Sequence, residues 1–337
     1  MELSETVARD SASWAQPAIP AAAAIAYPWV LQAFHASVTA GAGPVAVGWL
    51  VLAFALPLGC LALTTLARAP LPGLGAITPA TRRLALAALA APPLFVLAGV
   101  VTGLVHSPVR DIWIWPVAWI AAGAAATRTA HDAPDAPASG GLRVAHGISA
   151  ALILLFVAFH LSNHVTGLLG AEAHGRLMKV GRVAYRSPFV EPVLVGLLLF
   201  QVGSGLRLAW RWTSRPVEFV RAIQVGSGVY LAAFILTHLN SALVGARAVR
   251  GIETDWAWAT GAPEGLLLDG WNIRLAPHYA LGVFFVVAHL SCGLRQVLLA
   301  HGLRRAVANR IWALGLLGAA ALSAAITAAL CGARIGA

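Results

Sequence analysis

The amino-acid sequence predicts an all-α membrane protein, a polytopic bundle of about eight transmembrane helices. Hydrophobic residues make up 59% of the chain and charged residues only 11%, whereas soluble globular domains carry roughly 25% charged residues. Several apolar stretches reach the ~20 residues that a helix needs to cross a bilayer. The net charge of +10 comes from basic residues at the ends of these stretches, where they orient membrane helices. We therefore expect a lipid bilayer as the environment and no nucleic-acid partner.

Eight apolar stretches are expected to span the membrane. They cover about residues 44–66, 84–105, 112–127, 143–168, 190–212, 217–245, 273–299 and 311–332. Residues 20–40 are also apolar, but prolines and polar side chains interrupt them, which favours an interfacial or amphipathic helix over a ninth span. A stretch rich in Ala, Pro, Asp and Gly reads as a linker between two groups of helices. The expected parts are an N-terminal segment, a three-helix unit, a linker and a five-helix domain, at residues 1–43, 44–128, 129–142 and 143–333.

Charge distribution predicts how the helices are oriented. Arginines gather at one set of helix ends, which marks the cytoplasmic side. The opposite set includes the loop 247–272 with its acidic residues, although the loop 170–188 on that same side is basic. The arginine- and alanine-rich composition is typical of a bacterial protein, so we expect a multi-pass protein of the bacterial cytoplasmic (inner) membrane. Tryptophans of the loop 247–272 suit an interfacial belt or a cap over a site, namely Trp256, Trp258 and Trp271.

Histidines inside the apolar stretches indicate where chemistry occurs, because an imidazole in hydrocarbon needs a partner. His160 and His238 each lie about eight residues below the same end of their spans, which places both roughly 12 Å deep. Two histidines at one depth on two helices suit bis-imidazole ligation of haem iron. His289 is also deep, whereas His146 and His278 lie near helix ends, where hydrated interfacial histidines are expected.

Glycines supply the close backbone approach that a porphyrin between helices requires. The sequence Q-V-G-S-G occurs at 201–205 and again at 224–228, so the candidate cofactor-contacting glycines are Gly203, Gly205, Gly226 and Gly228. Small residues at such spacing also allow helices to pack without any cofactor, and both interpretations stay open. His164 lies one turn beyond His160, where it serves a hydrogen bond or a substrate path.

The five C-terminal stretches resemble the single-chain cytochrome b membrane anchor of succinate:quinone reductases and fumarate reductases, over about residues 143–333. The matching segments are R-V-A-H-G through F-H-L-S-N-H, Leu199–Leu208, A-I-Q-V-G-S-G through L-T-H-L-N, and Y-A-L-G-V through A-H-L-S-C-G-L. We number the five C-terminal stretches I to V in chain order. In that family one haem lies between helices I and III and a second between helices II and IV. The resemblance implies that His160 and His238 ligate the first iron, and that His289 matches the helix IV ligand of the second.

The chain departs from that family at two positions. Gln201 stands where the family has its helix II histidine, and a carboxamide is a poor iron ligand, so we expect one haem b. Val225 replaces the arginine that follows the helix III glutamine in the family. The three N-terminal helices have no counterpart there.

The leading functional hypothesis is a membrane-bound b-type cytochrome that transfers electrons between a redox partner and the quinone pool. The chain lacks a dinucleotide fingerprint and cysteine clusters, so we expect an electron-transfer or anchor subunit, with flavoprotein and iron-sulfur subunits on its cytoplasmic face. One alternative is a haem-free structural or transport subunit on a degenerate anchor fold. Another is a ferric-reductase-like dihaem cytochrome, in which His289 would face His146 and His278 would face His160.

Overall fold

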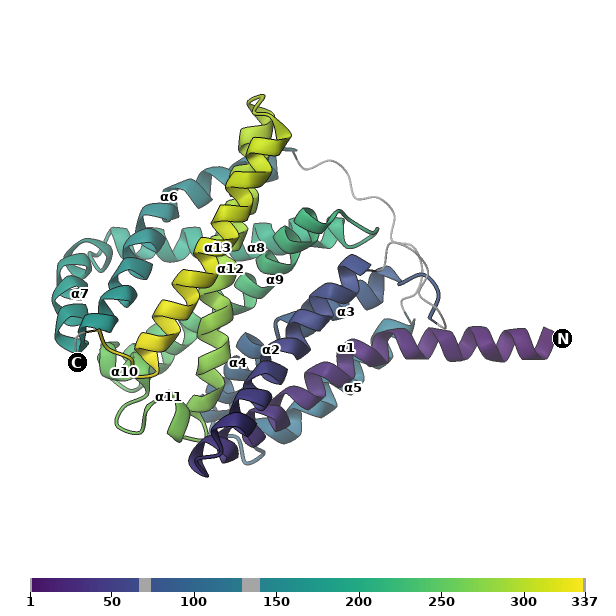
Figure 1. Ribbon diagram of the computed structural model, residues 1–337, viewed down its shortest axis with the longest axis horizontal. Coiled ribbons are helices and arrows are strands. Elements are labelled where there is room, and N and C mark those ends of the chain that lie inside the picture. Colours follow the sequence, from purple (N-terminus) through teal and green to yellow (C-terminus); the bar gives the residue numbers. More distant parts are fainter. Residues whose placement is uncertain (1, 67–73, 129–139, 336–337) are drawn as a thin grey trace. The chain divides into compact units, whose positions relative to one another are not determined.

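The structure of this chain is a computed structural model, which describes residues 2–66, 74–128 and 140–335. These residues form helices and no β-strand (Figure 1). Seven helices in the described ranges are long and apolar enough to cross a membrane, or eight if one bent pair counts as a single span. The prediction of an all-α polytopic bundle with about eight such helices is therefore confirmed.

The seven candidate spans include six of the predicted ones and add one at the N-terminus. The first two are Ala15–Thr39 within α1 (Glu2–Thr39) and Gly43–Thr65 within α2 (Gly43–Leu66). The next three are Gly140–Leu169, formed by α6 (Gly140–Val165) and the 3₁₀-helix η1 (Thr166–Leu169), Val190–Trp212, which is α8, and Phe219–Val249, formed by α9 (Phe219–Leu239) and the π-helix η2 (Asn240–Val249). The last two are Asn272–Ala300, formed by the 3₁₀-helix η3 (Asn272–Arg274) and α12 (Leu275–Ala300), and Arg305–Leu330, which is α13.

Prolines act differently in two N-terminal regions. Helix α1 runs through Pro17, Pro20 and Pro28 without a break, so the prolines of residues 20–40 do not interrupt this apolar stretch, contrary to expectation. The predicted span 84–105 is instead two helices, α3 (Pro79–Leu89) and α4 (Ala91–Leu104), bent by 65°. Pro92 and Pro93 open α4, and because they lack amide hydrogens the hydrogen-bond ladder of α3 cannot continue through them.

Helix α5 (Asp111–Arg128) occupies the predicted span 112–127, but it is not among the seven candidates. Its 18 residues carry a charge at each end, Asp111 and Arg128, so the apolar part between them is shorter than the ~20 residues typical of a span. The predicted linker 129–142 lies largely outside the described residues.

Two compact units make up the chain. The first comprises Met1–Ala138 and Arg207–Tyr230, and the second comprises Ser139–Leu206 and Leu231–Ala337. The division therefore falls inside α8 and α9, whose adjoining ends belong to the first unit. Arg82 joins α3 to this part of the chain, because its buried guanidinium donates hydrogen bonds to the carbonyls of Thr213 and Ile77 at 3.1 and 3.0 Å.

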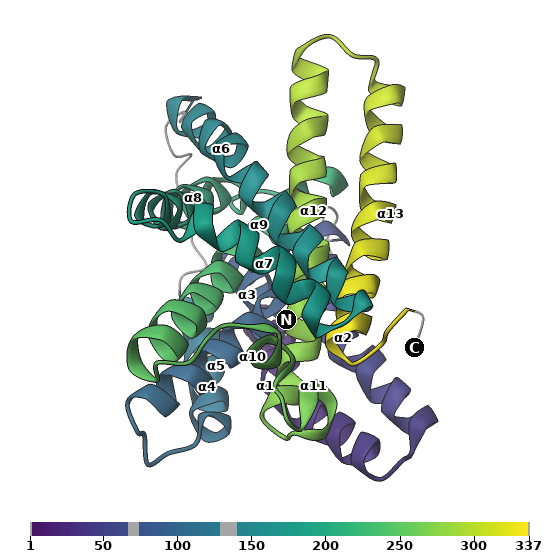
Figure 2. The ribbon, with the colours of Figure 1, turned by 90° about the vertical axis from the view of Figure 1, so that its left-hand side faces the viewer.

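The second unit carries the candidate site. Helices α12 and α13 form an antiparallel hairpin (Figure 2), in which Ser323 donates a hydrogen bond of 2.7 Å to the carbonyl of Ala280. Helix α6 is followed by α7 (Ala171–Tyr185), an amphipathic helix where a loop was expected. Two short helices, α10 (Trp256–Thr260) and α11 (Gly265–Leu268), precede α12.

Candidate functional site

The imidazoles of His160 on α6 and His238 on α9 lie next to each other in the second unit. Their ring centroids lie 5.9 Å apart, with an angle of 73° between the ring planes. Two imidazoles that held one metal atom between them, at metal–nitrogen distances of about 2 Å, would have ring centroids about 6 Å apart. His160 and His238 therefore have the spacing that would hold a haem between them.

Aromatic rings support both imidazoles from the same helices. Phe156, one turn before His160 on α6, stacks on it at 5.5 Å with an interplanar angle of 22°. Phe234, one turn before His238 on α9, is parallel to it within 6° at 5.9 Å. The four-residue spacing puts each aromatic ring and its histidine on one helix face. The π-helix η2 begins two residues after His238, and such segments occur frequently at functional sites.

A second group of polar side chains lies beside this pair, and we call it the polar cluster: Asn163, His164 and His174. The ring of His164 lies 4.7 Å from that of His160 and 5.4 Å from that of His174. Asn163 donates a hydrogen bond of 3.0 Å from Nδ2 to Nε2 of His174. Three further polar atoms, Asn163 Oδ1, His164 Nδ1 and His174 Nδ1, are buried without a hydrogen-bond partner in the part of the chain that the structure describes. Buried polar atoms of this kind require an explanation, and a bound ligand is one.

Trp256 covers the polar cluster. Its ring lies 4.6 Å from that of His174 and 6.3 Å from that of His164. A Cβ at Gly167 in η1 would lie 2.0 Å from the indole, so only glycine leaves room for this ring there. Of the three tryptophans expected in a belt or a cap, Trp256 is buried and has the position of a cap.

His174 was not among the residues singled out from the sequence, because it lies in the stretch 170–188 that was expected to be a loop. It is buried in α7 with Met178 and Gly181, and their spacing of four and three residues is the helical pattern that could have revealed it. Burial and the nearby Arg182 together lower the pKa of His174 to about 4, burial being the larger cause, while Asp255 opposes the shift. His174 is therefore neutral at physiological pH.

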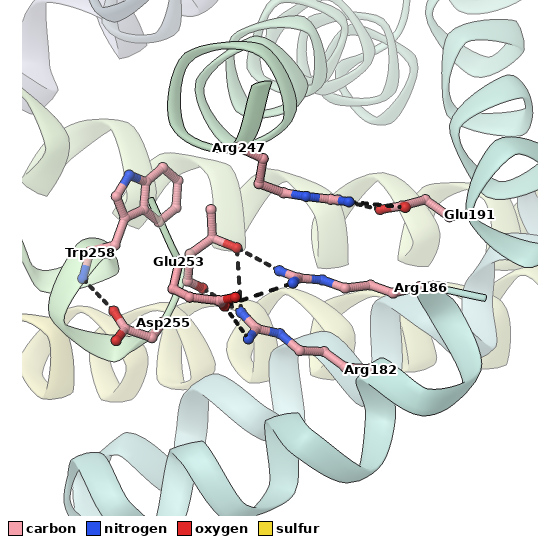
Figure 3. A network of polar contacts seen from close by, with 8 residues as sticks. Arg182, Arg186, Glu191, Arg247, Glu253, Asp255 and Trp258 are labelled. Carbon is pink, nitrogen blue, oxygen red and sulfur yellow. Dashed lines mark hydrogen bonds and ion pairs between the residues drawn. The ribbon is translucent and has the colours of Figure 1, made fainter. Parts of the chain in front are cut away.

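Ion pairs connect α7 to the acidic segment before α10, as Figure 3 shows. Arg182 contacts the carboxylate of Glu253 at 2.8 Å, and Arg186 lies 3.9 Å from the same group. Arg247 pairs with Glu191. Arg182 and Arg186 belong to the basic stretch 170–188, which was expected on the same side of the membrane as the acidic loop 247–272. Their ion pairs with Glu253 of that loop partly neutralise them.

The structure corrects the expectation for His278, which was placed at a hydrated interface. Its side chain is buried, with a relative exposure of 2%. The ring stacks on Phe234 at 4.5 Å, on the aromatic ring that also lies beside His238. The ring of His160 contacts the ring of His238. The pairing of His160 with His278, which the ferric-reductase-like arrangement requires, is not among the ring contacts of His160 in the described part of the chain.

The other pair of that arrangement is present. His146 on α6 and His289 on α12 have ring centroids 6.4 Å apart and an interplanar angle of 75°. Gln201 does not take a ligand position here, because its amide donates hydrogen bonds to the His146 carbonyl at 2.8 Å and to Ser149 Oγ at 2.5 Å. The first Q-V-G-S-G sequence therefore lies against the segment of α6 that carries His146.

The four candidate glycines have different surroundings. A Cβ at Gly205 would lie 3.4 Å from Cε1 of His146, so this glycine borders the His146 ring. A Cβ at Gly203 would meet open space. Gly226 belongs to the first unit, where a Cβ would lie 2.5 Å from Leu61 and 3.1 Å from Leu89, so it serves helix packing. Gly228 is half-buried in the same part of α9.

Among the described residues, no group of three or more His, Cys, Asp or Glu side chains is arranged to hold a metal ion. Two imidazoles alone do not complete the coordination of zinc, which takes four ligands in structural sites. A haem iron needs only axial ligands from the chain, because the porphyrin supplies the others. Comparisons with protein-family models, curated proteins and solved structures find no match to this chain.

Proposed function

We propose that this chain is a membrane-bound b-type cytochrome that transfers electrons between a redox partner and the quinone pool. The observation that carries the proposal is the separation of 5.9 Å between the rings of His160 and His238, inside a membrane-spanning unit. A haem held there would supply one-electron redox chemistry. The axial imidazoles and the apolar surroundings from Phe156 and Phe234 would tune its potential.

The polar cluster supports quinone as the substrate. A quinone has two carbonyl oxygens that accept hydrogen bonds, and the corresponding quinol has two hydroxyls that donate them. The unpartnered atoms of Asn163, His164 and His174 offer both an acceptor and ring nitrogens next to His160. Reduction of a quinone takes up two electrons and two protons, and oxidation of a quinol releases both. Neutral histidines accept or donate such protons, which is the role that we assign to His164 and His174.

The position in the cell and the partners are part of the same proposal. The arginine-rich helix ends support a bacterial cytoplasmic membrane with those ends in the cytoplasm. Flavoprotein and iron-sulfur subunits docked on that face would deliver or accept the electrons, which rests on the resemblance to reductase anchors.

The test is a visible spectrum and a pyridine haemochrome assay on the chain purified in detergent. We expect a low-spin b-type spectrum in the wild type and loss of the haem of this site in His160→Ala and His238→Ala. The matched control is His278→Ala, which removes another buried imidazole of the same region and should keep that haem. A folded wild-type protein without haem would overturn the proposal in favour of a structural or transport subunit.

A further inference from the structure

We propose that His146 and His289 hold a second haem at the other end of α6. The identity of the cofactor rests on the proposed function, but the site itself rests on its own contacts. The ring centroids lie 6.4 Å apart at 75°, close to the 5.9 Å and 73° of the first pair. Two imidazoles that held one metal atom between them would be separated by about 6 Å, and both pairs are close to this separation.

Hydrogen bonding determines which nitrogen of His146 is available as a ligand. Ser204 Oγ donates its only proton to the carbonyl of Phe200, at 2.5 Å. It can therefore only accept from His146, whose Nδ1 lies 2.8 Å away. Nδ1 of His146 then carries the ring proton, and Nε2 retains the lone pair that binds a metal. Metal-ligating histidines are commonly oriented by such a bond from the other ring nitrogen.

Helix α8 is shaped to seat this histidine. Gln201 bonds the backbone carbonyl of His146 and the hydroxyl of Ser149, so it ties α8 to α6 at the depth of the ring. Gly205 lets the backbone of α8 approach the imidazole, because a Cβ there would already be 3.4 Å from Cε1. Gln201, Ser204 and Gly205 come from one Q-V-G-S-G sequence. Gln201, which stands where the resembled family has a histidine ligand, therefore positions His146.

The site suits haem better than a simple metal ion. Among the described residues no third His, Cys, Asp or Glu joins His146 and His289 in a metal-binding group. Arg143 lies three residues before His146 and thus on an adjoining part of the helix surface, where its cation suits a haem propionate.

The two pairs lie far apart along one helix. His146 and His160 are fourteen residues apart, which corresponds to about 21 Å along the axis of α6. That distance is about two thirds of the ~30 Å hydrocarbon core. We infer that the two haems serve opposite sides of the membrane.

The first experiment measures haem content without any substitution. Purified wild-type chain should contain two haems per polypeptide by pyridine haemochrome, and electron paramagnetic resonance should show two low-spin ferric species. His146→Ala and His289→Ala should each lower the ratio from two to one and remove the same resonance. His160→Ala and His238→Ala should remove the other one.

The outcomes separate this inference from the proposed function. One haem per wild-type chain that persists in His146→Ala and disappears in His160→Ala would overturn the second site and leave the proposed function standing. One haem per wild-type chain that disappears in His146→Ala and persists in His160→Ala would keep the site at His146 and overturn the assignment to His160 and His238. A folded wild-type chain without haem would overturn both.

Two further variants guard against misfolding and test the hydrogen bond. His289→Gly should regain its missing low-spin resonance when free imidazole is added, which a merely unfolded variant would not do. Ser204→Ala should keep two haems per chain but shift the potential and the resonance of the His146 site alone, because the ring loses the acceptor that orients it. Equal shifts at both sites would contradict the positioning role of Ser204.

Discussion

The two ends of α6 differ in how their polar groups are satisfied. Around His146, the side chains of Gln201, Ser204 and Ser149 form hydrogen bonds with one another and with α6. Around His160, the polar cluster keeps three buried atoms without a hydrogen-bond partner among the described residues. Buried unsatisfied atoms cost free energy, and a bound substrate is one way to satisfy them. We infer that the His146 end holds its ligand rigidly, whereas the His160 end also reacts with a substrate.

The largest effect should come from removing one ligand at each end of α6. The double variant His146→Ala/His160→Ala should contain no low-spin haem, while the helical circular dichroism of the chain stays at the wild-type level. Pyridine haemochrome and gel filtration in detergent measure the two properties. If the double variant keeps as much low-spin haem as either single variant, the two ends do not hold separate haems.

The next effect distinguishes the reacting end from the closed end. His174→Phe preserves an aromatic ring beside Trp256 but cannot carry a proton, so quinol-dependent reduction of the cytochrome should slow about hundredfold. Haem content should not change. Ser149→Ala is the matched control, because it removes a polar group at the His146 end and should leave the rate within about twofold. Equal slowing in both variants would contradict the assignment of the quinone site to one end.

A pH effect follows from the burial of His174, which faces His164, Arg182 and Asp255. Its pKa is lowered from 6.5 to about 4 in the folded protein, so between these values the unfolded chain binds more protons. Stability is therefore lost as pH falls from about 6.5, with a slope of about 1.4 kcal/mol per pH unit from this group at most. The melting temperature in detergent should fall more between pH 7 and pH 5 in the wild type than in His174→Phe. Identical falls would show that His174 does not contribute.

The smallest effect concerns the ion pair between Arg182 and Glu253. The glutamate side chain is 71% exposed, and exposed pairs contribute about 0–1 kcal/mol. Glu253→Gln should therefore change the melting temperature little, with no change in haem content. Arg182→Gln should in addition raise the pKa of His174, because the guanidinium lowers it. The loss of stability should still begin near pH 6.5 but should end at a higher pH than in the wild type, because the folded-state pKa lies closer to 6.5. The measured result should be a smaller fall in melting temperature between pH 7 and pH 5.

Much of the fold was predictable because membrane helices are encoded locally. A helix in lipid must satisfy its own backbone hydrogen bonds, so a long apolar stretch is enough to predict a span. The bend between α3 and α4 was harder, because prolines in α1 cause no break and Pro92 and Pro93 do. The amphipathic α7 was not predicted, because the spans were recognised by long apolar stretches and α7 has only one buried face.

By itself, the sequence determined that this is a multi-pass α-helical membrane protein, and it predicted that His160 and His238 lie at one depth. Depth follows from counting residues along a helix axis, at 1.5 Å per residue. Only the tertiary structure decided which histidine faces which, because that depends on the rotation and packing of each helix. It placed His146 opposite His289, turned Gln201 onto the backbone of α6, and buried His174 beneath Trp256.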